Sequence, residues 1–148
     1  MRIALGADDS TRLVDVLEEL LQAEGHHVTR YGRAAGRDES WGQTAQQLAA
    51  AVAAGEHDQG IVCCWTGTGV SIAANKVPGV RAALCVDAET ARGARRWNDA
   101  NVLALSLRLT TEALAKEIWL AWSAQAYGGS EDESLSLLSA LDDRARGS

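Results

Sequence analysis

An apolar run that ends in two cysteines and then enters a glycine-rich turn holds the residues best suited to chemistry. It covers residues 60–76 and has the sequence GIVCCWTGTGVSIAANK. Glycines in such a turn let the backbone approach a ligand closely, and free N–H groups at the start of a following helix can hold an anion or a developing oxyanion. A thiol beside these groups could act as a base or a nucleophile. A plain strand-to-helix turn with a buried cysteine would have the same pattern, so other segments must separate the two interpretations.

Four other segments, taken together with this one, resemble the ribose-5-phosphate isomerase B and galactose-6-phosphate isomerase family. They are RIALGAD at 2–8, NKVPGVRAALC at 75–85, RRWNDANVLA at 95–104 and LAKEI at 114–118. The resemblance covers most of the first 125 or so residues. It implies isomerisation between an aldose and a ketose through an enediolate, with no cofactor and a sugar or sugar phosphate as the substrate.

The resemblance also implies catalytic and substrate-binding roles for individual residues. Cys64 matches the family's thiol base, and because strand side chains alternate, Cys63 would face the opposite side of the sheet. Thr66 matches a hydroxyl near the sugar, and Asp8 matches a carboxylate that contacts substrate hydroxyls. Asp8 could instead belong to the N-cap region of the next helix. The family's oxyanion-binding groups correspond to the side chain of Asn98 and to five backbone N–H groups, those of Gly67, Thr68, Gly69, Val70 and Ser71.

The chain departs from the family at positions that open the sugar ring or bind phosphate. The family usually has a histidine where this chain has Asp9, and another where it has Trp97, and we expect both of these residues to lie at the substrate-binding site. Arg108 matches one phosphate-binding arginine, but further arginines and a histidine of the family are replaced by the segment SEDES at 130–134. Like charges 4 Å apart repel by about 4 kcal/mol at an effective dielectric near 20, so acidic groups there would weaken phosphate binding.

Tryptophans are concentrated around the predicted site. Trp65 follows the thiol directly, Trp97 occupies the ring-opening position, and Trp41 lies in a loop where the family often has Asp-Tyr-Pro. We predict that these three indoles line one pocket, because sugar rings and cations both bind aromatic faces. The alternative is a subunit interface, where tryptophan is common. Trp119 and Trp122 lie on an amphipathic segment and are expected in the core or at an interface.

Composition is typical of one compact cytoplasmic domain covering residues 1–148. The chain has 148 residues, 47% of them apolar, and a net charge of -6 without a basic stripe, which argues against a nucleic-acid partner. No apolar run approaches the roughly 20 residues that span a membrane.

Three cysteines indicate free thiols in a reducing compartment. No zinc-ligand spacing is present, so we predict no metal, and the histidines are expected at the surface or at strand edges: His26, His27 and His57.

Short apolar runs alternate with longer amphipathic segments, which predicts an α/β fold. The expected architecture is a Rossmann-like, doubly wound, five-stranded parallel sheet with helices on both faces. In such folds ligands bind at the carboxyl ends of the strands, where Asp8, Cys64 and Thr66 would lie. The predicted strands cover 2–6, 27–31, 60–64, 81–84 and 102–105. The predicted helices cover 11–23, 43–54, 70–76, 88–96, 111–126 and 132–144.

Three functional hypotheses remain open from the sequence. The first is an isomerase with an altered substrate, either a short-chain sugar phosphate that needs no ring opening or an unphosphorylated sugar. The second is an ordinary ribose-5-phosphate isomerase. The third is a non-catalytic helper subunit or a small-molecule binding protein on the same fold.

The resemblance also implies a homodimer or higher oligomer whose sites lie at the interface. The C-terminal helix, at about 131–145, has an apolar stripe that could pack on a partner or on its own sheet. The stripe consists of Leu135, Leu137, Leu138 and Leu141.

Overall fold

The computed structural model describes residues 1–147 and contains one five-stranded parallel sheet in the order β2-β1-β3-β5-β4. All four strand pairs are parallel. The predicted α/β fold is therefore confirmed. The strands are β1 (Arg2–Ala7), β2 (His27–Gly32), β3 (Gln59–Cys64), β4 (Ala82–Leu84) and β5 (Val102–Ser106).

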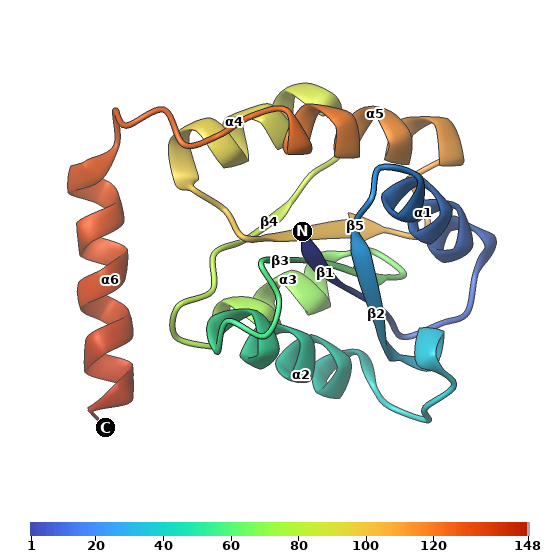
Figure 1. The fold of residues 1–148 in the computed structure, drawn as a ribbon. Helices are drawn as coiled ribbons and strands as arrows, with labels where there is room; N and C mark the ends of the chain where they lie inside the picture. The colour runs from blue at the N-terminus through green and yellow to red at the C-terminus, as the bar shows by residue number, and fades with distance from the viewer. Residues whose placement is uncertain (148) are drawn as a thin grey trace.

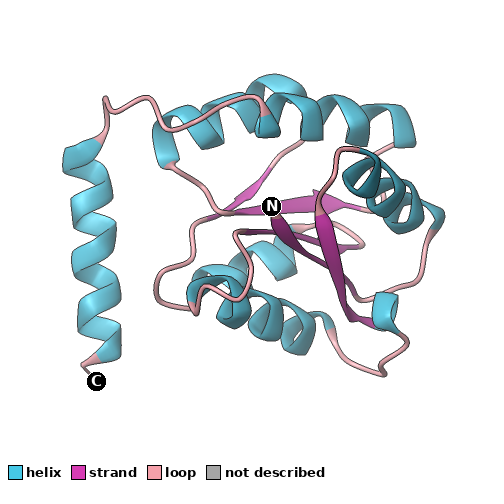
Figure 2. Ribbon diagram, in the orientation of Figure 1, coloured by secondary structure: helices cyan, strands magenta, loops and turns pink. Residues whose placement is uncertain are grey.

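Helices cover both faces of this sheet, as predicted. Figure 1 shows α1, α4 and α5 on one face and α2 and α3 on the other. Figure 2 shows the same layers, with the strands in the middle and helices on either side. The helices are α1 (Arg12–Ala23), the 3-10 turn η1 (Arg33–Ala35), α2 (Trp41–Ala53), α3 (Thr68–Asn75), α4 (Ala88–Asn98), α5 (Glu112–Ser123) and α6 (Asp132–Arg146).

Helix α2 begins two residues earlier than the hydrophobic pattern predicted, because a capping box sets its start. The Ser40 side chain accepts from the Gln43 backbone N–H at 3.1 Å, and the Gln43 side chain accepts from the Ser40 N–H at 2.9 Å. Both N–H groups would otherwise lack partners at the helix end. The cap makes Trp41 the first residue of α2.

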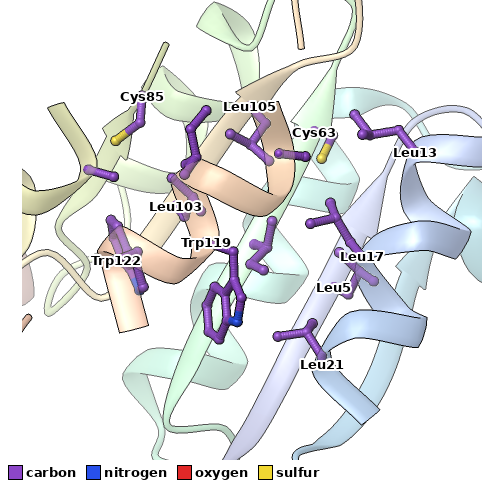
Figure 3. Packing of buried hydrophobic residues seen from close by; sticks show 14 of the residues in the cluster. Leu5, Leu13, Leu17, Leu21, Cys63, Cys85, Leu103, Leu105, Trp119 and Trp122 are labelled. Atoms are coloured by element: carbon purple, nitrogen blue, oxygen red, sulfur yellow. The ribbon is translucent and has the colours of Figure 1, made fainter. Parts of the chain in front are cut away.

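The central strands are buried on both faces, which explains their continuous apolar sequences. One cluster of buried residues joins the sheet to α1, α4 and α5, and a second joins it to α2 and α3. Cys63 belongs to the first cluster and Cys64 to the second, so the two cysteines lie on opposite faces. Figure 3 shows Cys63 among the leucines of the first cluster.

Two of the five tryptophans are core residues. Trp119 and Trp122 of α5 are fully buried, and their indole N–H groups donate to Glu24 at 3.1 Å and to Gln59 at 2.9 Å. The core alternative predicted for this pair is confirmed (Figure 3). Of the two alternatives predicted for His57, the surface is wrong, because its ring is buried beside the hydroxyl of Tyr31. His57 instead lies two residues before the start of β3.

Helix α6 stands apart from the two layers (Figure 1). None of its described residues is buried, and three leucines of its stripe are exposed. It is tied to the body near Gly79, whose backbone N–H donates to Asp142 at 2.9 Å. The alternative that α6 covers its own sheet is therefore wrong. The exposed leucines are Leu137, Leu138 and Leu141.

The strand order produces a crevice at the carboxyl ends of β1 and β3. From β1 the chain moves outward to β2, and then returns to place β3 on the other side of β1. Ala7 lies opposite Cys63 in the register, so the loops after these strands leave the sheet side by side. Such a reversal point is where open α/β sheets bind ligands.

No helix among residues 1–147 is long and apolar enough to cross a membrane.

Candidate active site

A pocket of about 270 Å³ lies at this crevice. Its wall combines one carboxylate, one thiol, two hydroxyls and two indoles, contributed by the ends of β1 and β3 and the starts of α2 and α3. Six of the thirteen residues that the sequence assigned to the site lie here. The lining residues are Asp8, Trp41, Cys64, Trp65, Thr66, Thr68 and Gly69.

The two adjacent cysteines differ sharply in their access to the pocket. Cys64 is the last residue of β3 and lines the pocket, although only 5% of its surface is exposed. Cys63 is fully buried on the other face, and this burial raises the pKa of its thiol to about 12. A thiol that loses its proton only near pH 12 is not a base at neutral pH. Cys64 is therefore the thiol that can act on a molecule in the pocket.

Free backbone donors follow the thiol strand at the start of α3. Gly67 adopts a left-handed conformation with φ of 77°, which turns the chain from β3 into α3. The N–H groups of residues 66–70 donate to no protein acceptor within the described chain. Unpaired N–H groups and the positive end of the helix dipole favour an anion at this position. The turn can therefore stabilise negative charge on a bound molecule.

Two hydroxyls and a carboxylate complete the polar part of the wall. The side-chain oxygens of Thr66 and Thr68 lie 2.8 Å apart and share a hydrogen bond. Burial raises the pKa of Asp8, and the negative charge of Asp9 raises it further, while a backbone hydrogen bond and Arg33 act in the opposite direction. These groups are suited to bind hydroxyls, because a carboxylate accepts from them and a threonine can donate or accept.

Trp41 closes one side of the pocket by packing directly on the backbone of α3. A Cβ atom added at Gly69 would lie 3.0 Å from Cε3 of the Trp41 indole. Any larger residue at position 69 would require the indole to move by a few tenths of an ångström. Trp65 lies on the same pocket with 64% of its surface exposed. The prediction of an indole-lined pocket thus holds within one chain for Trp41 and Trp65.

Trp97 and Asn98 lie elsewhere in the single chain. Both are exposed at the end of α4, on the other face of the sheet from α2 and α3, and line a separate surface depression with Gly93. Asn98 also lines the cleft between the body and α6. The expected meeting of Asn98 with the N–H groups of residues 67–71 does not occur within one protomer, because the sheet separates them.

Arg108 and Asp9 flank the pocket without lining it. The backbone N–H of Arg108 donates to the Trp65 carbonyl at 2.9 Å, which places the turn after β5 directly beside the pocket. The Arg108 side chain is exposed and forms none of the ion pairs found among residues 1–147. Asp9 is exposed and accepts from the backbone N–H of Ser10 at 2.8 Å.

The acidic segment 130–134 lies at the start of α6, away from the protomer's own pocket (Figure 1). The Tyr127 hydroxyl donates to Asp132 at 2.7 Å and accepts from the Glu131 N–H at 2.8 Å. Acidic side chains in the first turn of a helix also interact favourably with its dipole. The segment therefore has a local structural role at the beginning of α6.

Ser106 is a polar residue beside the site that was not among the predicted site residues. Ser106 is the last residue of β5, is 3% exposed, and lies opposite Cys64 in the β3–β5 register. The sequence feature that could have identified Ser106 is a serine at the end of an otherwise apolar strand that pairs with the thiol strand.

Among residues 1–147, no group of three or more histidine, cysteine or acidic side chains is arranged to hold a metal ion.

Comparison with known proteins gives one consistent family. The model of the family described as Ribose/Galactose Isomerase matches residues 3–136. The chain is 42% identical over 132 residues to D-erythrulose-4-phosphate isomerase from Pectobacterium atrosepticum, covering 87% of each protein. It is 46% identical over 101 residues to ribose-5-phosphate isomerase B from Escherichia coli, covering 68% of each.

The solved structures agree with the sequence relatives. Ribose-5-phosphate isomerase B from Clostridium thermocellum superposes with a TM-score of 0.91 at 35% identity. The superposition covers 97% of this chain and 99% of the other. The similarity therefore includes nearly the whole described chain, and not only the pocket and its loops.

Proposed function

Because this chain belongs to the ribose/galactose isomerase family, we propose that it interconverts an aldose phosphate and a ketose phosphate of short chain length, with D-erythrulose 4-phosphate as the leading candidate. Cys64 is the proposed base, and no cofactor takes part. Sugar-phosphate isomerisation is the activity named for the relatives.

The observation that carries the short-chain proposal is the pair of residues at the two histidine positions. Asp9 and Trp97 stand where the resemblance implies histidines that help to open a sugar ring. A four-carbon sugar 4-phosphate cannot form a five-membered ring, because the phosphate occupies the hydroxyl that would close it. Such a substrate arrives with an open chain and a free carbonyl. The loss of both imidazoles is then no obstacle to turnover.

The size of the pocket supports the same conclusion. The part of the site within one protomer has a volume of about 270 Å³, slightly below the roughly 300–1,000 Å³ of typical small-molecule sites, and a partner protomer would only enclose it further. Trp41 packs against Gly69 at one side and leaves little room for a longer chain there. The named activity of the Pectobacterium relative, an isomerase of D-erythrulose 4-phosphate, agrees with a small substrate.

The proposed chemistry moves one proton between neighbouring carbons. The Cys64 thiolate removes a proton from the hydroxyl-bearing carbon beside the carbonyl, and the electron pair moves onto the carbonyl oxygen to form an enediolate. The N–H groups at the start of α3 stabilise this oxyanion. The thiol then returns the proton to the neighbouring carbon, while a second proton passes between the two oxygens. The paired hydroxyls of Thr66 and Thr68 are placed to relay it.

A homodimer would complete the site. Asn98 and Trp97 lie outside the protomer's own pocket, and the exposed leucines of α6 indicate a missing packing partner. We infer that the α4 residues of one protomer face the Cys64 pocket of the other. Arg108 is the proposed cation for the substrate phosphate, since its backbone is bonded to Trp65 and its side chain is exposed.

Solvent proton exchange is the direct test of the substrate. Purified protein in deuterated water would be given aldoses and ketoses of four to six carbons, each with and without phosphate, and followed by NMR. We expect the fastest exchange, at the carbon next to the carbonyl, for four-carbon ketose and aldose phosphates. The phosphate-free compounds are the matched controls, because any contribution of phosphate binding is absent from them.

Ordinary ribose-5-phosphate isomerase activity is the second candidate. It is favoured by the 46% identity to the Escherichia coli enzyme, although that match covers only 68% of the chain. The same panel decides between the two candidates. Fastest exchange with ribose 5-phosphate would replace the short-chain proposal with this one. No exchange with any compound would favour a helper subunit or a binding protein.

Changing Trp41 should alter the preference for chain length. Trp41→Ala removes the indole that packs on Gly69, so the pocket becomes longer on that side. We expect kcat/KM for a four-carbon phosphate to fall roughly 10-fold through lost packing and positioning. The ratio of kcat/KM for a five-carbon phosphate to kcat/KM for the four-carbon phosphate should rise. Trp41→Phe keeps an aromatic face and should retain the original preference. Equal loss on both substrates in Trp41→Ala would contradict a role in chain length.

A further inference from the structure

The side chain of Ser106 connects the turn after β5 with the end of the thiol strand. Its hydroxyl donates to the Trp65 carbonyl at 3.0 Å and accepts from the Leu109 N–H at 3.1 Å. Only 3% of the residue is exposed, so water does not compete for these bonds. Both the donor and an acceptor position of the hydroxyl are therefore used within the protein.

The Trp65 carbonyl is held from two directions. In addition to the Ser106 hydroxyl, it accepts the backbone N–H of Arg108 at 2.9 Å. The preceding carbonyl, that of Cys64, accepts the N–H of Leu107 at 2.9 Å. The turn at 106–109 thus clamps the backbone immediately after the thiol, and Ser106 is the only side chain that takes part in the clamp within the described residues.

Fixing this carbonyl also fixes the next N–H group. The peptide unit is planar and trans, so the Thr66 N–H points opposite to the Trp65 carbonyl, away from the turn that holds it. Thr66 lines the pocket, and its N–H donates to no acceptor in the part of the chain that is described. We propose that Ser106 is a positioning residue of the isomerase reaction, which holds the Trp65–Thr66 peptide so that the Thr66 N–H donates to the enediolate oxygen.

This inference rests on the proposed function at Cys64 but concerns a residue that does not touch the substrate. Without the Ser106 hydroxyl, the Trp65 carbonyl keeps one donor and gains freedom to rotate about the Arg108 bond. The Thr66 N–H then points at the enediolate oxygen for only part of the time. Removing an oxyanion donor costs roughly 10²–10³ in kcat, so partial misalignment should cost about 10-fold.

The test compares Ser106→Ala with wild type in turnover and in binding of two analogues. We expect kcat to fall about 10-fold with KM changed less than about 2-fold, because the donor acts on charge that develops during the reaction. Affinity for a hydroxamate analogue of the enediolate should fall in the same proportion as kcat. Affinity for the corresponding alditol phosphate, which carries no oxyanion, should be unchanged. A general loosening of the site would weaken both analogues equally.

Two further variants make the result decisive. Ser106→Cys has nearly the same shape but is a weaker donor, so its kcat should lie between those of wild type and the alanine variant even if the latter folds poorly. Ser123→Ala removes an exposed hydroxyl at the end of α5 and should leave every parameter unchanged. A Ser106→Ala variant with the wild-type kcat, or with equal losses of affinity for both analogues, would overturn the role of Ser106 and leave the proposed function intact. Wild-type protein inactive on the whole substrate panel would overturn the proposed function and the inference with it.

Discussion

Replacing Cys64 with alanine is expected to lower the rate of solvent proton exchange by about 10³-fold, since general-base catalysis contributes roughly 10²–10⁴. Cys64 is the thiol at the pocket wall, beside the free N–H groups of α3. The substrate should still bind, because the hydroxyl and phosphate contacts proposed for it do not involve sulfur. The measurement is proton exchange on the preferred substrate by NMR, with substrate affinity determined separately by calorimetry.

Cys63→Ala is the matched control for this prediction. Cys63 is the adjacent residue on the same strand, but it faces the other cluster and is fully buried. Its replacement should lower stability by about 1 kcal/mol and leave exchange near the wild-type rate. Alkylation at pH 8 should modify Cys64 and spare Cys63, whose pKa is about 12. Retained exchange in Cys64→Ala, or equal losses in both variants, would remove the thiol from the mechanism.

Gly67→Ala is expected to have the second largest effect, on stability and activity together. Gly67 has φ of 77°, and an added Cβ would lie 2.6 Å from Leu84 Cδ1 and 2.9 Å from the Leu105 carbonyl carbon. The side chain of Leu84 can move, but the backbone of β5 cannot without disturbing the sheet. We expect a loss of about 2–4 kcal/mol in the free energy of unfolding, from left-handed strain and from the clash. Activity should fall at least about 100-fold, because the N–H groups beside Cys64 shift.

Gly55→Ala separates strain from damage to the site. Gly55 has φ of 78° but nothing within 4 Å of an added Cβ, and it lies after α2, away from the pocket. The free energy of unfolding of Gly55→Ala should fall by only about 1 kcal/mol, and its activity should be unchanged. Denaturant unfolding and proton exchange measured on both variants check the prediction. A Gly67→Ala protein with the stability and exchange rate of Gly55→Ala would show that the turn tolerates a side chain and does not position the donors.

The sequence by itself determined the type of most elements and the family. The apolar run that ends at Cys64 was predicted as a strand of a sheet covered on both faces, and side-chain alternation along it separated Cys63 from Cys64. The glycines after it indicated the turn into α3. These properties are local, because periodicity and turn chemistry depend on residues near one another in the chain. The family followed from five such segments, and the comparisons confirm it.

Tertiary structure decided which of the candidate residues meet. Trp41 reaches the pocket that Cys64 lines because α2 packs beside α3, and Gly69 provides the space for its indole. Trp97 and Asn98 are separated from that pocket because the crossover after β4 places α4 on the opposite face. Ser106 contacts Trp65 because β5 lies between β3 and β4 in the sheet, directly beside the thiol strand. These contacts depend on strand order and helix packing, which join residues far apart in the chain, and no local pattern records them.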